Sequence, residues 1–139
     1  MNVTVNYLMK CHVNAINEIL RDQGVKEIKS FEYNEGNWAL FGAFVDQKLV
    51  GIVGLYLYNR LPCKDYPNGL VAEIGSLYVK HEYRKNGIAT KLVEKAVNFA
   101  KVSSLYIDAI VCDSTDIGSE IANKFGFIES TEYRQWLQL

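Results

Sequence analysis

The sequence has few of the residues that place a protein outside the cell or in a membrane. Its three cysteines form no Cys-x-x-Cys pair, which disfavours a disulfide scaffold or a zinc site and fits a reducing compartment. With only two histidines, a histidine-rich metal centre is not expected, and we predict no metal. The first residues lack the features of a signal peptide, and no apolar stretch reaches membrane-spanning length. We therefore expect a cytoplasmic protein with no membrane partner.

An excess of charge of one sign is also absent. The chain has 15 lysines and arginines against 16 aspartates and glutamates, with no basic block, so nucleic acid is a poor candidate partner. Hydrophobic residues make up 49% of the chain and charged residues 22%, which predicts a packed core. Because 139 residues are enough for one domain and few for two, we expect a single domain over residues 1–139.

The N-terminal half predicts a helix and a β-hairpin. Apolar residues recur at helical spacing over Met9–Leu20, and Gly24 stands where a helix would end. The segments Trp38–Val45 and Lys48–Tyr58 are rich in aromatic and β-branched residues. Asp46-Gln47 between them predicts a two-residue hairpin turn.

The C-terminal half predicts a strand, a helix and a second strand. These are Leu70–Val79, in which Gly75-Ser76 indicates a bulge, then a helix from Ile88 to about Lys101, then a buried strand over Leu105–Cys112. Because such crossovers are right-handed, the two strands should run parallel. A short helix ended by Gly126 and a last strand, over Ser119–Phe125 and Glu132–Gln138, should follow. The sum is an α/β fold: a mixed, mostly antiparallel central sheet with helices on both faces and one parallel βαβ unit.

The turn before the second helix carries the clearest functional signal. Arg84, Lys85 and Gly87 lie between an apolar strand and the helix that begins at Ile88. A helix N-terminus presents unpaired N–H groups and partial positive charge. Gly87 allows a close approach of backbone to a ligand. The turn therefore predicts a binding site for a phosphate-bearing cofactor.

Three motifs together are typical of one enzyme family. Arg84-Lys-Asn-Gly87-Ile-Ala89 opens the helix, Asn123-Lys-Phe-Gly126-Phe127 stands near the C-terminus, and Lys48-Leu-Val-Gly-Ile-Val begins a hairpin strand. They resemble, in turn, the pyrophosphate loop Gln/Arg-x-x-Gly-x-Gly/Ala, the Tyr-x-x-x-Gly-Phe element and the third strand of the GNAT superfamily of acetyl-CoA-dependent N-acetyltransferases. The resemblance covers roughly residues 5 to 137.

The resemblance implies a sheet in which two parallel strands splay apart to hold CoA. Backbone groups of Leu77 and Val79 would pair with the pantetheine amides, the N–H groups of residues 85–90 would hold the pyrophosphate, and Arg84 would support the turn or a phosphate. A solvated surface turn is the alternative for Arg84 and Lys85. The implied cofactor-binding residues are Leu77, Tyr78, Val79, Arg84, Lys85, Asn86, Gly87, Ile88, Ala89 and Thr90.

The resemblance also points to Glu73 as the general base. An alkylammonium, with a pKa of about 10, must lose its proton before it attacks a thioester. Glu73 stands where many family members carry a catalytic glutamate, and burial in an apolar strand would raise its pKa. The alternative is a solvent-facing or salt-bridged side chain. A backbone N–H of the Gly75-Ser76 bulge or of Leu77 would stabilise the oxyanion.

The general acid of the family is missing. The position four residues before the Gly-Phe pair is Ala122 rather than tyrosine, and the family's asparagine position is Thr115. Tyr78, Tyr106 and Tyr133 are candidate replacements, although a packing role is the commoner one for such residues. Unassisted departure of the CoA thiolate is also plausible, because a thiol has a lower pKa than an amine.

The acceptor site is expected at the loops between Gly24 and Trp38 and between Tyr58 and Leu70. Aromatic and acidic residues gather there and would suit a cationic amine, although packing of aromatics at loops explains them equally well: Tyr33, Trp38, Tyr56, Tyr58, Tyr66, Glu32, Glu35 and Asp65. We predict acetyl transfer from acetyl-CoA to a primary amine of a small molecule, a peptide or a protein.

Two other functions compete with this prediction. A non-catalytic acyl-CoA-binding sensor or partner-binding module is the main alternative, favoured by the missing tyrosine. A nucleotide-binding domain is weaker, because neither Gly-x-x-x-x-Gly-Lys-Ser/Thr nor Gly-x-Gly-x-x-Gly occurs. A homodimer through Trp136 and Leu139 of the last strand is a further hypothesis.

Overall fold

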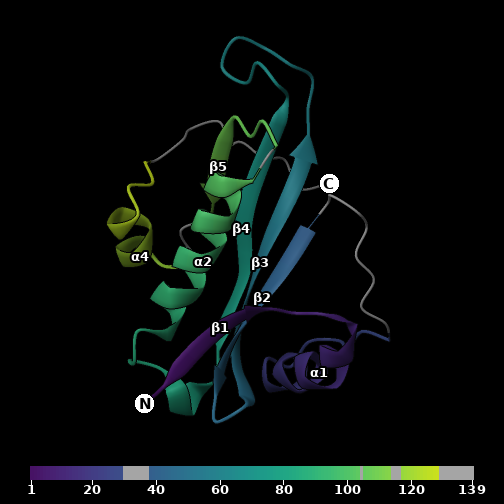
Figure 1. The fold of residues 1–139 in the computed structure, drawn as a ribbon, viewed down its shortest axis with the longest axis vertical. Helices are drawn as coiled ribbons and strands as arrows, with labels where there is room; N and C mark the ends of the chain where they lie inside the picture. Colours follow the sequence, from purple (N-terminus) through teal and green to yellow (C-terminus); the bar gives the residue numbers. More distant parts are fainter. Residues whose placement is uncertain (30–37, 104, 114–116, 129–139) are drawn as a thin grey trace.

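A five-stranded sheet forms the centre of the molecule (Figure 1). The computed structural model describes residues 1–29, 38–103, 105–113 and 117–128. The strands lie in the order β1-β2-β3-β4-β5. They span β1 (Val3–Tyr7), β2 (Trp38–Val45), β3 (Lys48–Asn59), β4 (Leu70–Val79) and β5 (Ala109–Cys112). Strands β1 to β4 pair antiparallel, and β4 and β5 run parallel, which confirms the predicted mixed sheet with one βαβ unit.

Helices cover both faces of the sheet. Helix α2 (Ile88–Val102) packs on one face and α1 (Val13–Asp22) on the other (Figure 1). The apolar residues of α2 recur at helical spacing, so a single stripe of the helix is buried against the sheet: Ile88, Leu92, Val93, Ala96, Val97 and Ala100. The remaining short helices are η1 (Lys10–His12), η2 (His81–Tyr83) and α4 (Ser119–Lys124).

The predicted turns lie where local sequence placed them. Asp46 and Gln47 have φ angles of +51° and +65°, the pair of left-handed residues that joins a two-residue hairpin without splaying its strands. Gly24, after α1, has a φ of +72°, and Gly126, after α4, has a φ of +81°. Both glycines therefore end their helices as predicted.

The predicted bulge is present in β4. The register of β3 against β4 shifts by one residue, so that Val53 faces both Ser76 and Leu77. Ser76 is left-handed there, with a φ of +55°. Because side chains alternate along a strand, the extra residue changes which positions point to each face. Glu73, before the bulge, and Tyr78, after it, therefore both lie on the α1 face of the sheet.

Strand β5 (Ala109–Cys112) is shorter than the predicted strand Leu105–Cys112. Tyr106 is 79% exposed, so the prediction of a buried strand over residues 105–108 is wrong. The chain reaches β4 at Asp108, whose N–H donates to the Leu70 carbonyl and whose carboxylate accepts hydrogen bonds from the Leu70 N–H and from the backbone and side-chain nitrogens of Asn68. Pairing along β4 starts at the next residue because this contact brings the chain to the sheet.

The sequence pattern did not predict strand β1. Its five residues alternate only weakly in burial, and the strand is stabilised by pairing with β2, from Val3 with Val45 to Tyr7 with Phe41. Partners about 40 positions apart in the chain cannot be identified from local residue patterns.

Some predictions lie outside the described residues. These are the last strand over Glu132–Gln138, with Trp136 and Leu139, and the position of Thr115. In the described part of the chain, no helix combines the length and apolar character needed to cross a bilayer.

Candidate active site

The turn between β4 and α2 forms an anion site from backbone groups. Gly87 is the N-cap of α2, with a φ of +74°, and no side chain caps the helix. Lys85 is also left-handed, with a φ of +63°. The first turn of α2 carries no acidic residue, and its first helical bond runs from the Lys91 N–H to the Gly87 carbonyl. The N–H groups of residues 88–90 therefore point out of the helix end, where its dipole favours an anion.

Side chains hold this turn in shape. The Nε of Arg84 donates a 2.9 Å hydrogen bond to the Val79 carbonyl, and its guanidinium lies 5.2 Å from the centroid of the Tyr78 ring. Asn86 Nδ2 donates to the carbonyls of Tyr83 and Arg84, at 3.1 and 3.0 Å. These contacts fix the backbone of the turn, and Arg84 itself remains exposed.

A pocket of about 700 Å³ lies against this turn. Nine of the ten residues that the resemblance implied line it: Leu77, Tyr78, Val79, Arg84, Lys85, Gly87, Ile88, Ala89 and Thr90. Asn86, the tenth, braces the turn through the carbonyls it binds.

Four further residues complete the pocket lining: Tyr83, Glu120, Ile121 and Lys124. Three of these come from α4, which lies beside α2 at the pocket (Figure 1). Sequence reasoning missed them, because their types carry no signal and only the docking of α4 brings them to the turn. The one available clue was Lys124, which lies within the C-terminal motif that starts at Asn123.

Tyr78 joins the pocket to helix α1. Its hydroxyl donates a hydrogen bond to Oδ2 of Asp22, on the last turn of α1. This hydrogen bond, followed by burial and the Asp22 charge, raises the pKa of Tyr78 above its ordinary value. The hydroxyl therefore stays protonated near neutral pH and donates its proton to the hydrogen bond with Asp22. This bond makes Tyr78 a weaker candidate for the general acid that would replace the family's tyrosine.

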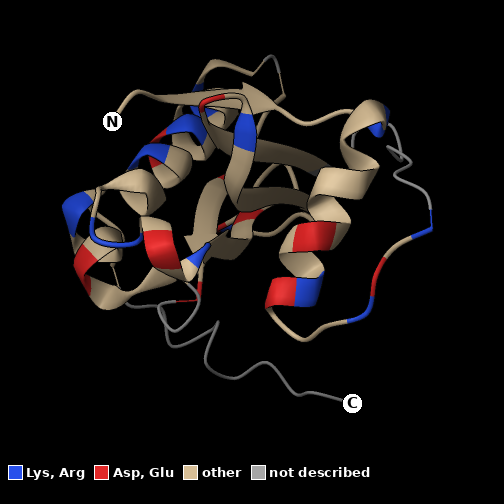
Figure 2. Ribbon diagram, turned by 90° about the horizontal axis from the view of Figure 1, so that it is seen from below, with Lys and Arg blue, Asp and Glu red and all other residues tan. Residues whose placement is uncertain are grey.

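An ion pair between buried Lys80 and exposed Glu18 lies next to this contact. Lys80 is only 5% exposed, and its Nζ lies 3.0 Å from Oε1 of Glu18, one helical turn before Asp22. Figure 2 shows charged residues of both signs on the last turns of α1 and along α2. Two carboxylates of α1 therefore hold two residues at the end of β4, immediately before the anion-binding turn.

Glu73 lies on β4 ahead of the bulge and outside the pocket lining. Its side chain is half-buried, and Oε1 accepts a 3.3 Å hydrogen bond from the hydroxyl of Tyr58. Burial first, then the charge and hydrogen bond of Glu73, raise the pKa of Tyr58, so that Tyr58 remains a donor. Glu73, the expected base, and the Gly75-Ser76 bulge, expected to supply a backbone donor to the oxyanion, lie on the same strand.

The other candidates for proton donation lie apart from this cluster. Ala122, at the position of the missing tyrosine, is buried in α4. Tyr106 is exposed, and Tyr133 lies outside the described residues. Among the residues that the structure describes, no group of three His, Cys, Asp or Glu side chains could hold a metal ion.

The expected acceptor residues are only partly brought together. Tyr56 and Tyr58 share the α1 face of β3 next to Glu73. Tyr66 instead stacks under the guanidinium of Arg60, at 4.2 Å, and Asp65 is exposed in the β3–β4 loop. The remaining members fall outside the described residues or side chains: Glu32, Tyr33, Glu35 and Trp38.

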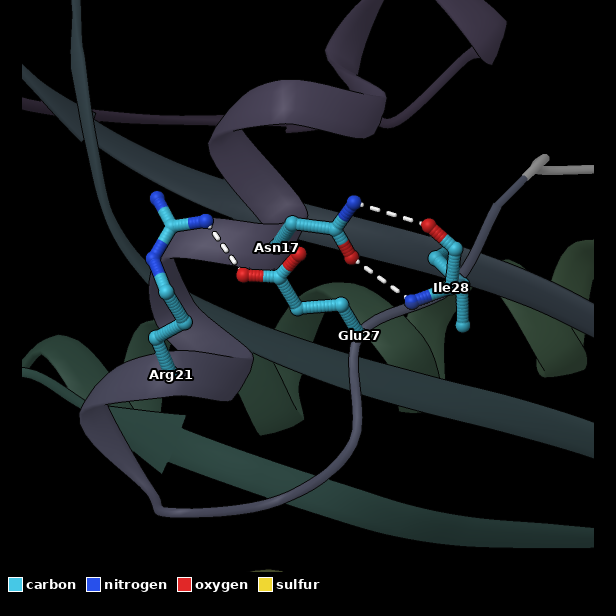
Figure 3. Close-up of polar contacts among 4 residues, drawn as sticks. All are labelled: Asn17, Arg21, Glu27 and Ile28. Atoms are coloured by element: carbon cyan, nitrogen blue, oxygen red, sulfur yellow. Dashed lines mark hydrogen bonds and ion pairs between the residues drawn. The ribbon is translucent and has the colours of Figure 1, made fainter.

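The chain that follows α1 is anchored to the helix (Figure 3). The side-chain amide of Asn17 both donates to the Ile28 carbonyl and accepts from the Ile28 N–H, each at 2.8 Å. Arg21 forms an ion pair with Glu27 beside it. Asn17 thus satisfies the hydrogen-bonding groups of the Ile28 backbone, as a neighbouring strand would. It thereby fixes the start of the segment that is predicted to border the acceptor.

Comparisons with known proteins agree with this arrangement. A model of the acetyltransferase (GNAT) family matches residues 5–127. A predicted acetyltransferase from Clostridium acetobutylicum, crystallised with acetyl-CoA, has the same fold (TM-score 0.73, 18% identity, covering 99% of this chain and 96% of that one). So does an aminoglycoside acetyltransferase from an uncultured soil metagenomic sample, in complex with sisomicin (TM-score 0.71, 18% identity, 99% and 96%). A ribosomal-protein-alanine N-acetyltransferase from Brucella melitensis is also similar (TM-score 0.70, 16% identity, 100% and 97%). No curated protein matches the sequence significantly.

Proposed function

Because the chain belongs to the GNAT family of acetyltransferases, we propose that it transfers the acetyl group of acetyl-CoA to a primary amine. One observation carries this proposal: the residues implied for the cofactor, from separate parts of β4, the turn and α2, line a single pocket. Proteins of this fold act on an aminoglycoside and on a ribosomal protein, which supports an amine acceptor on a small molecule or a protein.

The residues of the turn fit the diphosphate of CoA. The N-terminus of α2 has neither a side-chain cap nor an acidic residue in its first turn, so no side chain of the helix itself competes with an anion for these N–H groups. An added Cβ on Gly87 would meet no atom within 4 Å, so the space above the turn is open to a ligand. Lys85 and Arg84 add positive charge at the same place.

Glu73 is proposed as the general base. The ammonium proton of the acceptor passes to the Glu73 carboxylate, directly or through water, and the neutral nitrogen then attacks the thioester carbonyl. The Tyr58 hydroxyl orients the carboxylate through its hydrogen bond to Oε1. A backbone N–H at the bulge stabilises the oxyanion, and the carbon–sulfur bond breaks to release the CoA thiolate. The attacking nitrogen loses its second proton to solvent as the amide forms. With Ala122 at the position of the family's tyrosine, the thiolate leaves without that acid.

The experiment is an amine panel offered to the purified chain with acetyl-CoA, with release of the CoA thiol followed over time. We expect thiol release that depends on the acceptor, and acetylated product by mass spectrometry. The alternative function, a non-catalytic acyl-CoA-binding module, is favoured by Ala122. Tight binding of acetyl-CoA by calorimetry, with no acceptor-dependent thiol release for any amine, would support the module instead.

A further inference from the structure

The ring of Tyr56 packs against β3 and β4 beside the bulge. It covers Gly54 and Gly75, which pair with each other across the two strands. A Cβ on residue 54 would come within 2.6 Å of the ring Cζ, and one on residue 75 within 3.5 Å of Cε2. The ring can occupy this position only because residue 54 has no side chain.

In this position the Tyr56 hydroxyl reaches across the strand pair and hydrogen bonds to Oγ of Ser76. Ser76 is left-handed, with a φ of +55°, a conformation that disfavours every residue with a Cβ. The Ser76 side chain is exposed, so packing does not enforce this conformation. The bond from Tyr56 is therefore a specific stabilisation of a strained residue.

The conformation of Ser76 has a direct consequence for the pocket. Ser76 and Leu77 together face Val53, and Leu77 is the first residue of β4 that lines the pocket. A rotation about the Ser76 backbone would therefore redirect the following N–H, at the edge of β4 where the pocket begins. Strained residues of this kind are common at sites that hold a reacting group.

We propose that Tyr56 is a positioning residue for acyl transfer, which clamps Ser76 in its left-handed conformation and so orients the backbone donors of the bulge. This inference rests on the proposed function, because the donors matter only if a thioester carbonyl binds beside them. Tyr56 acts through Ser76 rather than on the substrate. It is distinct from Glu73 and Tyr58, which form their own hydrogen bond on the same face.

Substitution of the hydroxyl alone tests the clamp. Tyr56→Phe keeps the ring over Gly54, so the fold should be retained, and kcat should fall about tenfold, the loss that one hydrogen bond of ordinary strength predicts. The Kd of acetyl-CoA should change less than twofold. Ser76→Ala removes Oγ but keeps the backbone strain, so it should lower kcat as much as Tyr56→Phe does. The double variant, Tyr56→Phe with Ser76→Ala, should have the same kcat as either single variant, because both changes remove the same hydrogen bond. Tyr7→Phe, on β1, is the matched tyrosine control and should leave kcat unchanged.

A glycine at position 76 separates positioning from direct catalysis. Gly accepts a positive φ without strain, so Tyr56→Phe should change kcat less than twofold in a Ser76→Gly background. A tenfold loss in that background would overturn the inference, because the hydroxyl would then act on the substrate itself. So would an unchanged kcat for Tyr56→Phe in the native background.

Amide hydrogen exchange without substrates gives a second, independent readout. The amides of residues 76–78 should exchange about tenfold faster in Tyr56→Phe than in the native chain. In the Ser76→Gly background, these amides should exchange at the same rate whether residue 56 is tyrosine or phenylalanine. If no amine is acetylated by the native chain, the proposed function fails. The exchange measurement still tests whether Tyr56 clamps Ser76. A faster exchange of these amides in Tyr56→Phe supports the clamp, and an exchange rate equal to that of the native chain refutes it.

Discussion

The hydroxyl of Tyr58 donates a hydrogen bond to Oε1 of Glu73, from β3 to β4, at 3.3 Å. The raised pKa of Tyr58, caused first by burial and then by the Glu73 charge, keeps this hydroxyl a donor across the neutral range. The contact places the proposed base in a defined orientation, on the same face of the sheet as Tyr56 and Tyr78.

Glu73→Gln keeps the shape of the side chain and the hydrogen bond from Tyr58 but removes the base. We expect kcat to fall by about 10²- to 10³-fold, the usual contribution of a general base, with the Kd of acetyl-CoA unchanged. Steady-state rates and calorimetry measure the two quantities. Glu94→Gln, on the exposed face of α2, is the control and should retain full activity. A kcat for Glu73→Gln equal to the native value at every pH would remove Glu73 from the mechanism.

Gly87→Ala should weaken binding of acetyl-CoA at least tenfold. Gly87 and Gly24 have φ angles of +74° and +72°, and in each case an added Cβ would meet no atom within 4 Å. Both alanine variants should therefore lose about 1–2 kcal/mol of folding stability to backbone strain. Only at Gly87 would the new methyl group occupy the space above the pocket. Equal Kd values for the Gly87 and Gly24 variants would refute a phosphate site at this turn.

Lys124→Ala tests a pocket residue that only the structure revealed. If its ammonium meets a CoA phosphate, loss of the charge should raise the Kd of acetyl-CoA about fivefold, or ~1 kcal/mol, as for an exposed ion pair. The difference from the native chain should shrink at high salt, because exposed charges are screened. Lys101→Ala, at the far end of α2, should bind normally at both salt concentrations. A native Kd for Lys124→Ala at low salt would exclude this contact.

The ion pair of Glu18 with Lys80 predicts a pH dependence of stability. The hydrogen bond from Lys80, and then its charge, lower the pKa of Glu18 below its ordinary value of 4.5. A carboxyl with a lowered pKa stabilises the folded state above its unfolded pKa, and that contribution is lost as pH falls through the folded pKa. We therefore expect Tm to fall more steeply below about pH 4.5 in the native chain than in Glu18→Gln. Near neutral pH Glu18→Gln should have the lower Tm, because Lys80 is left buried without its carboxylate.

Thermal melts from pH 3 to pH 7 measure this difference. Glu94→Gln should follow the native curve throughout, since Glu94 is exposed on the opposite side of the sheet. Parallel curves for Glu18→Gln and the native chain would show that the ion pair contributes nothing to stability.

Asn17→Ala removes both hydrogen bonds to the backbone of Ile28 (Figure 3). Because Asn17 is only 9% exposed, the unpaired backbone groups should cost about 1–3 kcal/mol in the free energy of unfolding, measured with urea. Asn14→Ala, on the exposed face of the same helix, is the control. In activity assays the Asn17 variant should raise the KM of the amine and leave that of acetyl-CoA unchanged, since Ile28 leads into the segment proposed to border the acceptor. An increase confined to the KM of acetyl-CoA would contradict this placement.

The elements that depend on neighbours in the chain were predictable from the sequence. The hairpin turn at Asp46-Gln47, the bulge next to Gly75 and helix α2 all follow from residue types at short spacing. The same local pattern indicated the anion-binding turn, because a helix N-terminus and its preceding loop are continuous in sequence.

The tertiary structure alone decided the contacts between residues far apart in the chain. It pairs β1 with β2, delays the start of β5 to Ala109, brings Lys124 of α4 to the pocket, and joins Lys80 to Glu18 across 62 positions. The clamp of Tyr56 on Ser76, 20 positions apart, belongs to this group as well. Local patterns could not reveal these contacts, because each depends on strand register or helix docking, which only the packing of the whole chain establishes.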